Sequence, residues 1–352
     1  MTDQKKLRVV VIGAGMAGVL AGIKLKQEGL YDFVIYEKAD RIGGTWRENT
    51  YPGLTCDVPS HHYTYSFERN PDWTRHFPPG AEIQTYFEDT TEKYGIYEHI
   101  RFNTEISKAN FVNGQWLLEM KDGSAEQADI VIAATGVLHH PSYPNIAGTE
   151  TFQGALFHSA RWDHSVDLDD KRIGVIGNGS TGVQIISALA GRASKLQHFQ
   201  RTAQWIMPTE NGYFSEEERK TFREDPAALA AAMDVETYNQ NVELYTQGIT
   251  GQNPELAQVF AKPCRENLDQ SIRDPELKEK LLPDHEPMCK RLIFSADYYE
   301  AIQHPKVELV TDDIKEIEAA GIRTSDGVLH ELDVIVFATG FKADQFMRPM
   351  EV

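Results

Sequence analysis

Short apolar runs separated by glycine turns shape the beginning of the chain. Val9–Ile12 and Phe33–Tyr36 are unbroken apolar runs, typical of parallel strands that are buried on both faces. Between them, Ala17–Gln27 is long enough for a helix and directly follows a glycine-rich turn. The order of strand, helix and strand predicts a parallel βαβ unit.

The same pattern returns in the middle of the chain. Arg172–Ile176 and Lys195–Phe199 are expected to be strands, with a helix over Val183–Ala190 between them. Two such units predict an α/β fold with two Rossmann-like dinucleotide-binding domains. The stretch from about 210 to 285 is rich in Glu, Ala, Gln and Asn with weak apolar periodicity, so we expect a mostly helical insertion in the second domain.

Each unit has the spacing Gly-x-Gly-x-x-Gly where its first strand turns into its helix. The first turn contains Gly13, Gly15 and Gly18, and the second contains Gly177, Gly179, Ser180, Thr181 and Gly182. In such turns the first glycine allows a tight bend, and the second lets the backbone approach a pyrophosphate that the helix N-terminus binds. In this context of strand and helix, both turns predict nucleotide sites.

The residue that follows the second strand differs in charge between the two units. Glu37 lies 24 residues after Gly13, whereas Arg201, followed by Thr202, lies 24 residues after Gly177. A carboxylate accepts hydrogen bonds from ribose hydroxyls and repels a 2′-phosphate, whereas a guanidinium pairs with that phosphate bidentately. The first site is therefore predicted to bind FAD and the second NADP, with a solvated surface role for Arg201 as the alternative.

Composition narrows the class of protein further. The 352 residues carry a formal net charge of −18, which argues against sequence-independent binding to nucleic acid or to an anionic membrane. No run of about 20 apolar residues predicts a membrane span. The three cysteines form no CxxC pair, which favours a reducing, cytoplasmic location. The pairs His61-His62 and His139-His140 lack spaced acidic or cysteine partners, so no metal site is expected.

Three further motifs stand outside the glycine turns. A linker between the two units has the spacing F-x-G-x-x-x-H-x-x-x-W-D, formed by Phe152, Gly154, His158, Trp162 and Asp163. A loop after Glu37 contains Gly44, Thr45 and Trp46, then Tyr-Pro-Gly, then Asp57. The third motif is the adjacent pair Lys290-Arg291. By residue type alone, the linker histidine and tryptophan would pack, the loop suits a site wall, and the two cations could be solvated.

Together these motifs resemble the fingerprint of the type I Baeyer-Villiger monooxygenases over essentially the whole chain. The resemblance implies an NADPH-dependent flavin monooxygenase that inserts one oxygen atom of O₂ next to a ketone carbonyl, giving an ester or lactone through a C4a-peroxyflavin. It implies that Arg291 is the catalytic cation, that Asp57 orients it, and that Lys290 joins Arg201 on the NADP 2′-phosphate. The glycine loop with Trp46 would then line the FAD site.

A short repeated sequence pattern predicts how the two domains are connected. Asp129–Gly136 and Asp333–Gly340 share an aspartate, three β-branched residues, one variable position and Ala-Thr-Gly. In flavoproteins with two dinucleotide-binding domains, which these segments resemble, such strands mark where the chain crosses between domains. We therefore expect a discontinuous FAD domain, 1–145 and 332–352, around an NADP domain at 146–331.

Two alternatives remain from the sequence. A flavin-containing monooxygenase acting on nitrogen or sulfur would use the same cofactors, but its linker lacks the Trp162-Asp163 ending. A non-catalytic nucleotide-binding remnant is the other, favoured by the short C-terminus. Family members continue far beyond the Ala-Thr-Gly-Phe segment, so we expect this chain, ending at Val352, to be a truncated form. A disulfide reductase is disfavoured because no redox cysteine pair is present.

Overall fold

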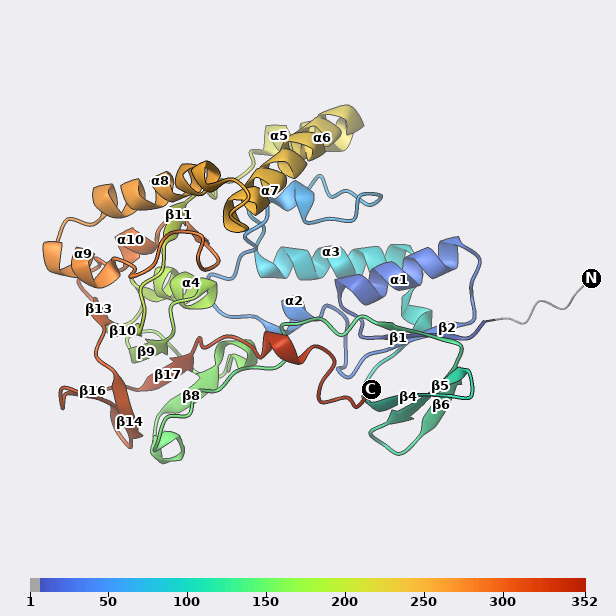
Figure 1. Cartoon of the computed structure of the whole chain (residues 1–352), viewed down its shortest axis with the longest axis horizontal. Helices are drawn as coiled ribbons and strands as arrows, with labels where there is room; N and C mark the ends of the chain where they lie inside the picture. Colours follow the sequence, from blue (N-terminus) through green and yellow to red (C-terminus); the bar gives the residue numbers. More distant parts are fainter. Residues whose placement is uncertain (1–6) are drawn as a thin grey trace, which may run out of the picture.

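Two parallel sheets organise the molecule, one in each half (Figure 1). The structure, a computed structural model, describes residues 7–352. The sheet of the first unit has the strand order β3-β2-β1-β7, with all strands parallel. These strands are β1 (Val9–Ile12), β2 (Phe33–Tyr36), β3 (Ile100–Arg101) and β7 (Ile130–Ala133).

Alternate residues of β1 divide the core of the first unit into two layers. Val9 and Val11 pack on the face covered by α1 (Met16–Gln27) and α3 (Gly80–Lys93). Val10 and Ile12 point the opposite way, because side chains alternate along a strand. They contact a small antiparallel sheet formed by β4 (Ile106–Val112), β5 (Gln115–Met120) and β6 (Ala125–Ala128).

The second unit has a five-stranded parallel sheet of order β13-β10-β9-β17-β8. Helix α4 (Ser180–Leu189) packs on one face and an antiparallel sheet packs on the other. The parallel strands are β8 (Ala155–His158), β9 (Arg172–Ile176), β10 (Lys195–Phe199), β13 (Val307–Val310) and β17 (Val334–Phe337). The antiparallel strands are β14 (Ile314–Glu318), β15 (Gly321–Thr324) and β16 (Leu329–Glu331). With two such sheets, the predicted pair of Rossmann-like units is confirmed.

The position of β17 differs from the sequence-based boundary, which placed all of 332–352 with the first unit. The strand lies between β9 and β8 in the second sheet. All four of its residues are buried, because both faces of a central strand are covered. Only the segment after Gly340 returns to the first unit, where the Ala109 N–H donates to the Glu351 carbonyl at 2.8 Å.

Two antiparallel segments carry the chain between the units. The first runs through residues 140–142 and the second through 340–342, with Pro141 paired to Phe341. The Ser142 N–H donates to the Gly340 carbonyl at 2.8 Å, and the Lys342 N–H donates to the His140 carbonyl at 2.9 Å. The connection between the units is therefore two-stranded.

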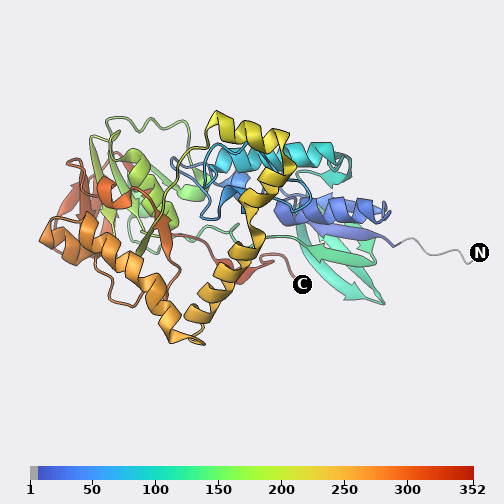
Figure 2. The same ribbon diagram turned by 90° about the horizontal axis from the view of Figure 1, so that it is seen from above.

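The predicted helical insertion is confirmed, and it lies between β11 (Ile206–Pro208) and its parallel partner β12 (Ile293–Ser295). Its helices are α5 (Glu216–Glu224), α6 (Pro226–Met233), α7 (Val235–Ile249), α8 (Pro254–Ser271) and α9 (Pro275–Leu281). Three of them begin with proline after an Asp or Asn cap, which is the favoured way to start a helix. In Figure 2, α7 and α8 form a V beside the two units.

The insertion also contacts the first unit. The His61 ring packs against Phe222 of α5 at 4.9 Å between ring centroids, and Arg223 pairs with Asp72 at 2.5 Å. The remaining short elements are α2 (Thr45–Glu48), α10 (Tyr298–Ala301), η1 (Ser60–His62), η2 (Tyr97–His99), η3 (Thr149–Thr151), η4 (Ser159–Arg161) and η5 (Ala343–Gln345). Within residues 7–352, no helix combines the length and apolar character that a bilayer crossing requires.

Candidate active site

The first glycine turn is closed by contacts that leave no room for side chains. Gly13 has φ +101°, and a Cβ there would lie 2.6 Å from the Ala134 carbonyl oxygen. A Cβ on Gly18 would overlap the Gly13 carbonyl, so both positions require glycine. Gly15 faces Gly44, whose Cβ would approach the Gly15 Cα to 3.2 Å. Bare backbone therefore surrounds the N-terminus of α1.

A cavity of about 460 Å³ opens on this turn. Its walls include Gly15, Gly44 and Thr45, and the buried Trp46, whose Nε1 donates to the Tyr63 hydroxyl at 3.1 Å. Glycine backbone at a helix N-terminus suits a pyrophosphate, and the adjacent aromatic wall suits a planar ring system. These residues fit FAD.

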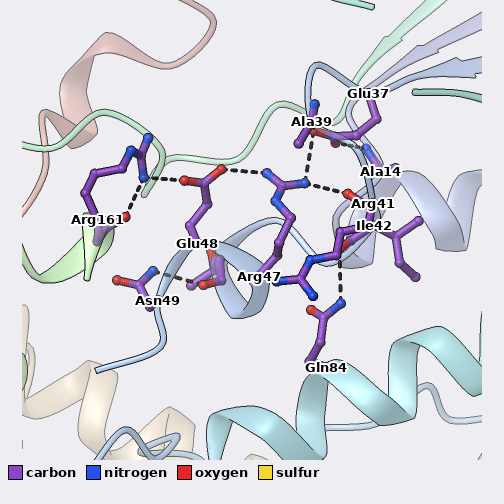
Figure 3. Close-up of polar contacts among 12 residues, drawn as sticks. Ala14, Glu37, Ala39, Arg41, Ile42, Arg47, Glu48, Asn49, Gln84 and Arg161 are labelled. Carbon is purple, nitrogen blue, oxygen red and sulfur yellow. Dashed lines mark hydrogen bonds and ion pairs between the residues drawn. The ribbon is translucent and has the colours of Figure 1, made fainter. Parts of the chain in front are cut away.

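Glu37 closes the turn from the inside, as Figure 3 shows. Its side chain accepts hydrogen bonds from the N–H groups of Ala14 at 2.8 Å and Ala39 at 3.0 Å. A third bond, 3.0 Å long, comes from Arg47, which sequence reasoning missed. A carboxylate offers about four acceptor positions, so one remains for a ribose hydroxyl. The sequence did contain a sign that Arg47 could pair with Glu37: it is a cation that directly follows Trp46 and lies close to Glu37 in sequence.

The second glycine turn repeats the first. Gly177 has φ +107°, and a Cβ there would lie 2.5 Å from the Ala338 carbonyl oxygen. A Cβ on Gly182 would overlap the Gly177 carbonyl, whereas one on Gly179 would meet nothing within 4 Å. Ser180 and Thr181 form the first turn of α4, which begins three residues earlier than the sequence predicted because Gly179 is its N-cap. This turn fits a second dinucleotide.

The two cations predicted for the 2′-phosphate are exposed. Arg201 follows β10, and Lys290 lies between α9 and β12. Within residues 7–352 neither side chain makes a hydrogen bond or an ion pair with the protein. Thr202 is half-buried, and its carbonyl accepts a 2.7 Å bond from Asn178. The joint role of the two cations therefore stays a prediction.

Asp57 and Arg291 form an ion pair that joins the two units. The Arg291 side chain is 74% exposed, and its hydrogen bond to Asp57 raises the pKa of the guanidinium. Asp57 lines a cleft of about 680 Å³ whose walls come from both units, including Trp46 and Gln184. The structure thus brings together the two residues that the resemblance assigns to catalysis.

The linker motif, whose histidine and tryptophan were expected to pack by residue type alone, contains an edge strand and contacts the second crossing segment. His158 is fully buried; its Nδ1 accepts from the Ala160 N–H at 3.1 Å, and its Nε2 lies 3.1 Å from the Gly340 carbonyl. An accepting Nδ1 leaves the proton on Nε2, which donates to Gly340. Burial lowers the pKa of this imidazole, so the neutral form is favoured.

The other linker residues have packing or turn contacts. A Cβ on Gly154 would overlap the Asp333 carbonyl, next to the Phe152 ring. Trp162 packs edge-on against Phe157 at 5.0 Å between ring centroids, and Asp163 accepts from the Ser165 N–H at 2.9 Å. In the described part of the chain, no three His, Cys, Asp or Glu side chains gather as metal ligands would.

Comparisons with known proteins match this geometry. Residues 5–217 match the flavin-binding monooxygenase-like family. An uncharacterized monooxygenase of Mycobacterium tuberculosis is 49% identical over 98% of this chain and 69% of its own length. A Baeyer-Villiger monooxygenase of Streptomyces coelicolor is 39% identical over 95% of this chain, which spans 64% of that protein.

Solved structures are similar as well. The crystal structure of cyclohexanone monooxygenase from Rhodococcus sp. Phi1 bound to NADP⁺ is 32% identical, with a TM-score of 0.80, over 95% of this chain and 70% of that one. The chain therefore belongs to the flavin-binding monooxygenase-like family, and its identification with the type I Baeyer-Villiger monooxygenases is confirmed.

Proposed function

We propose that this chain oxidises a ketone to an ester or lactone with O₂ and NADPH, using FAD held in the first unit and NADPH in the second. The Asp57–Arg291 ion pair supports this most directly, because it places a fixed cation from one unit against a carboxylate from the other. FAD, when bound and reduced by NADPH, would supply the electrons that activate O₂; one oxygen atom of O₂ is then inserted and the other leaves as water.

Arg291 is proposed to stabilise the negative charge that develops on the carbonyl oxygen of the ketone. A guanidinium stays protonated throughout the physiological pH range, and Asp57 raises its pKa further. Asp57 accepts a hydrogen bond from one terminal nitrogen, Nη2, and so favours one orientation of the planar group. The remaining donors of the exposed fork are free to bind an oxyanion.

The second unit is proposed to select NADPH through Arg201 and Lys290. Within the described residues neither side chain forms a hydrogen bond or an ion pair, although Lys290 contributes to lowering the pKa of Asp284, so a 2′-phosphate would gain their charge without displacing an existing ion pair. Gly179 leaves open space at the N-terminus of α4 for the pyrophosphate.

The three free thiols, Cys56, Cys264 and Cys289, support a reducing, cytoplasmic setting.

The test is ester formation from a panel of ketones with NADPH under air, comparing the wild type with Arg291→Ala. The variant should keep FAD and lose ester formation by more than about 10²–10³-fold, the effect of removing one oxyanion donor. Arg291→Lys should restore little, because an ammonium cannot reproduce the planar fork.

Arg265→Ala is the matched control, because Arg265 is another exposed arginine of the insertion, paired with Glu286. It should leave ester formation unchanged. Wild-type ester yields from Arg291→Ala would refute the assigned role. A wild type that oxidises a thioether or an amine but no ketone would instead assign heteroatom oxygenation.

A further inference from the structure

One ten-residue segment of the first unit, residues 48–57, carries a series of side-chain contacts to the second unit. We call it the docking segment. Its contacts are Glu48–Arg161, Thr50–His164, Tyr51–Thr181, Tyr51–Gln184, Thr55–Gln184 and Asp57–Arg291. The segment therefore touches the linker, the second glycine turn and the catalytic cation.

Glu48 leads from the docking segment back to the first glycine turn through side chains. Its Oε1 accepts from Arg47 Nη2 at 2.6 Å, and Arg47 Nη1 donates to Glu37 at 3.0 Å. On the opposite side, Glu48 Oε2 accepts from Arg161 of the second unit. Figure 3 shows the resulting chain of alternating charges, Glu37, Arg47, Glu48 and Arg161. The first three of these residues line the cavity that fits FAD.

The chain of contacts continues into the linker. Arg161 also donates to the Ala160 carbonyl at 2.5 Å, and the Ala160 N–H donates to His158. His158 in turn contacts the Gly340 carbonyl, where the chain crosses back to the first unit. One polar path thus joins the first nucleotide turn to the linker and to the second crossing segment.

The exposure of these side chains decides how strongly each ion pair is held. Glu37 and Arg47 are only 5% and 7% exposed, so neither can leave the other without stranding a buried charge. Arg161 is 46% exposed, and an exposed ion pair shifts an equilibrium by about fivefold at most. The ion pair between Arg161 and Glu48 is therefore weak enough to open and close, whereas the pair between Arg47 and Glu37 stays formed.

We propose that Arg161 is a positioning residue that, through Glu48 and Arg47, couples occupancy of the first nucleotide site to the arrangement of the linker. A ligand hydroxyl on Glu37 adds a further donor to that carboxylate, whose bond to Arg47 is already in place, and so narrows the orientations that Arg47 offers to Glu48. Glu48 is then held with one oxygen toward Arg161. The inference rests on the proposed function only in taking that site as the FAD site.

A double-mutant cycle on FAD affinity tests this coupling, with flavin fluorescence as the readout for Arg161→Gln, Glu48→Gln and the double variant. Arg161→Gln should raise the FAD dissociation constant about twofold to fivefold. Glu48→Gln should raise it about tenfold, because the buried Arg47 loses a charged partner. The double variant should match Glu48→Gln alone, because Arg161 acts only through Glu48.

Arg192→Gln is the matched control, since Arg192 is 49% exposed and pairs with Asp169 at 2.8 Å within the second unit. It should leave FAD affinity unchanged. Wild-type affinity in Arg161→Gln, or effects of the two substitutions that simply add, would overturn the proposal.

Hydrogen exchange of the Ala160 amide gives a second readout that needs no turnover. Glu48→Gln should speed this exchange in the FAD-free protein although Ala160 belongs to the other unit, and added FAD should slow it in the wild type more than in Arg161→Gln. Unchanged exchange in Glu48→Gln would also overturn the proposal. Absence of ester from the wild type would refute ketone oxidation while leaving these two results to stand.

Discussion

The two glycine turns share a backbone but differ in the side chain that follows the second strand of each unit. In each turn the first glycine adopts a positive φ beneath a carbonyl of an Ala-Thr-Gly segment, Ala134 in one and Ala338 in the other. Yet Glu37 is buried and bound by three donors, whereas Arg201 is exposed and forms no hydrogen bond or ion pair with the protein within residues 7–352. The two turns thus share a backbone geometry, and we propose that this one residue decides which cofactor each turn binds.

A second difference lies under the turns. The residue 21 positions after the first glycine is Val34 in the first unit and His198 in the second. His198 is fully buried, with Nε2 3.1 Å from the Gly177 carbonyl and Nδ1 3.1 Å from the Tyr298 hydroxyl. Only the second turn therefore rests on a titratable group at this position.

The strongest test of the shared geometry is alanine at the first glycine of each turn. Gly13→Ala should abolish FAD binding and Gly177→Ala should abolish NADPH binding, because each adds backbone strain of about 1–3 kcal/mol plus a clash with a carbonyl. Absorbance of bound flavin and NADPH titration measure the two effects. Gly179→Ala is the control, since its Cβ meets nothing within 4 Å and the fold should be retained. Loss of FAD from Gly177→Ala would show that the units do not bind independently.

The buried histidine should make the second unit sensitive to acid. Burial lowers the pKa of His198 to about 4, below its ordinary value near 6.5, so the unfolded chain binds the extra proton between these values. The contribution of His198 to the free energy of unfolding is therefore fully present above about pH 6.5. It falls by about 1.4 kcal/mol per pH unit as the pH is lowered toward 4. In His198→Gln the free energy of unfolding should change with pH by about 1.4 kcal/mol per unit less than in the wild type, between pH 4 and 6.5. Urea unfolding at several pH values measures it. An unchanged slope would assign the acid sensitivity to other groups.

Removing the charge that distinguishes the two sites should relax cofactor choice. Arg201→Ala should narrow the preference for NADPH over NADH by about 1–3 kcal/mol, the value of a charge-assisted hydrogen bond. Steady-state flavin reduction with each nucleotide measures the preference, with Arg192→Ala as an exposed arginine control in the same unit. A variant that keeps the full preference would leave Arg201 as a surface charge.

The linker histidine should affect the reaction, while the protein still saturates with flavin. His158→Ala removes the buried contact to Gly340, so ester formation should fall about tenfold, the scale of one lost hydrogen bond. FAD content, read from the absorbance spectrum, should stay at the wild-type level because His158 lies in the second sheet. Unchanged ester formation would restrict this residue to packing.

Local patterns predicted the central strands well. The bounds of β1, β2, β9 and β10 agree with the sequence-based expectation. β1 and β2 are short apolar runs buried between covering layers, whereas β9 and β10 were recognised because the second unit repeats the order of strand, glycine turn, helix and strand. The boundary at residue 332 was wrong because sheet membership depends on pairing with β8 and β9, far away in sequence. Arg161–Glu48 was missed for a similar reason, since 113 residues separate the partners and neither has a distinctive spacing.

The two-stranded connection between the units has a mechanical consequence. Because Pro141 and Phe341 lie side by side in an antiparallel ladder, the connection is a ribbon and not a single tether. A ribbon bends across its flat face far more easily than it twists or bends edgewise. We therefore expect this connection to favour relative movement of the units about one axis, and a protease that cuts one of the two segments would leave the halves joined by the other.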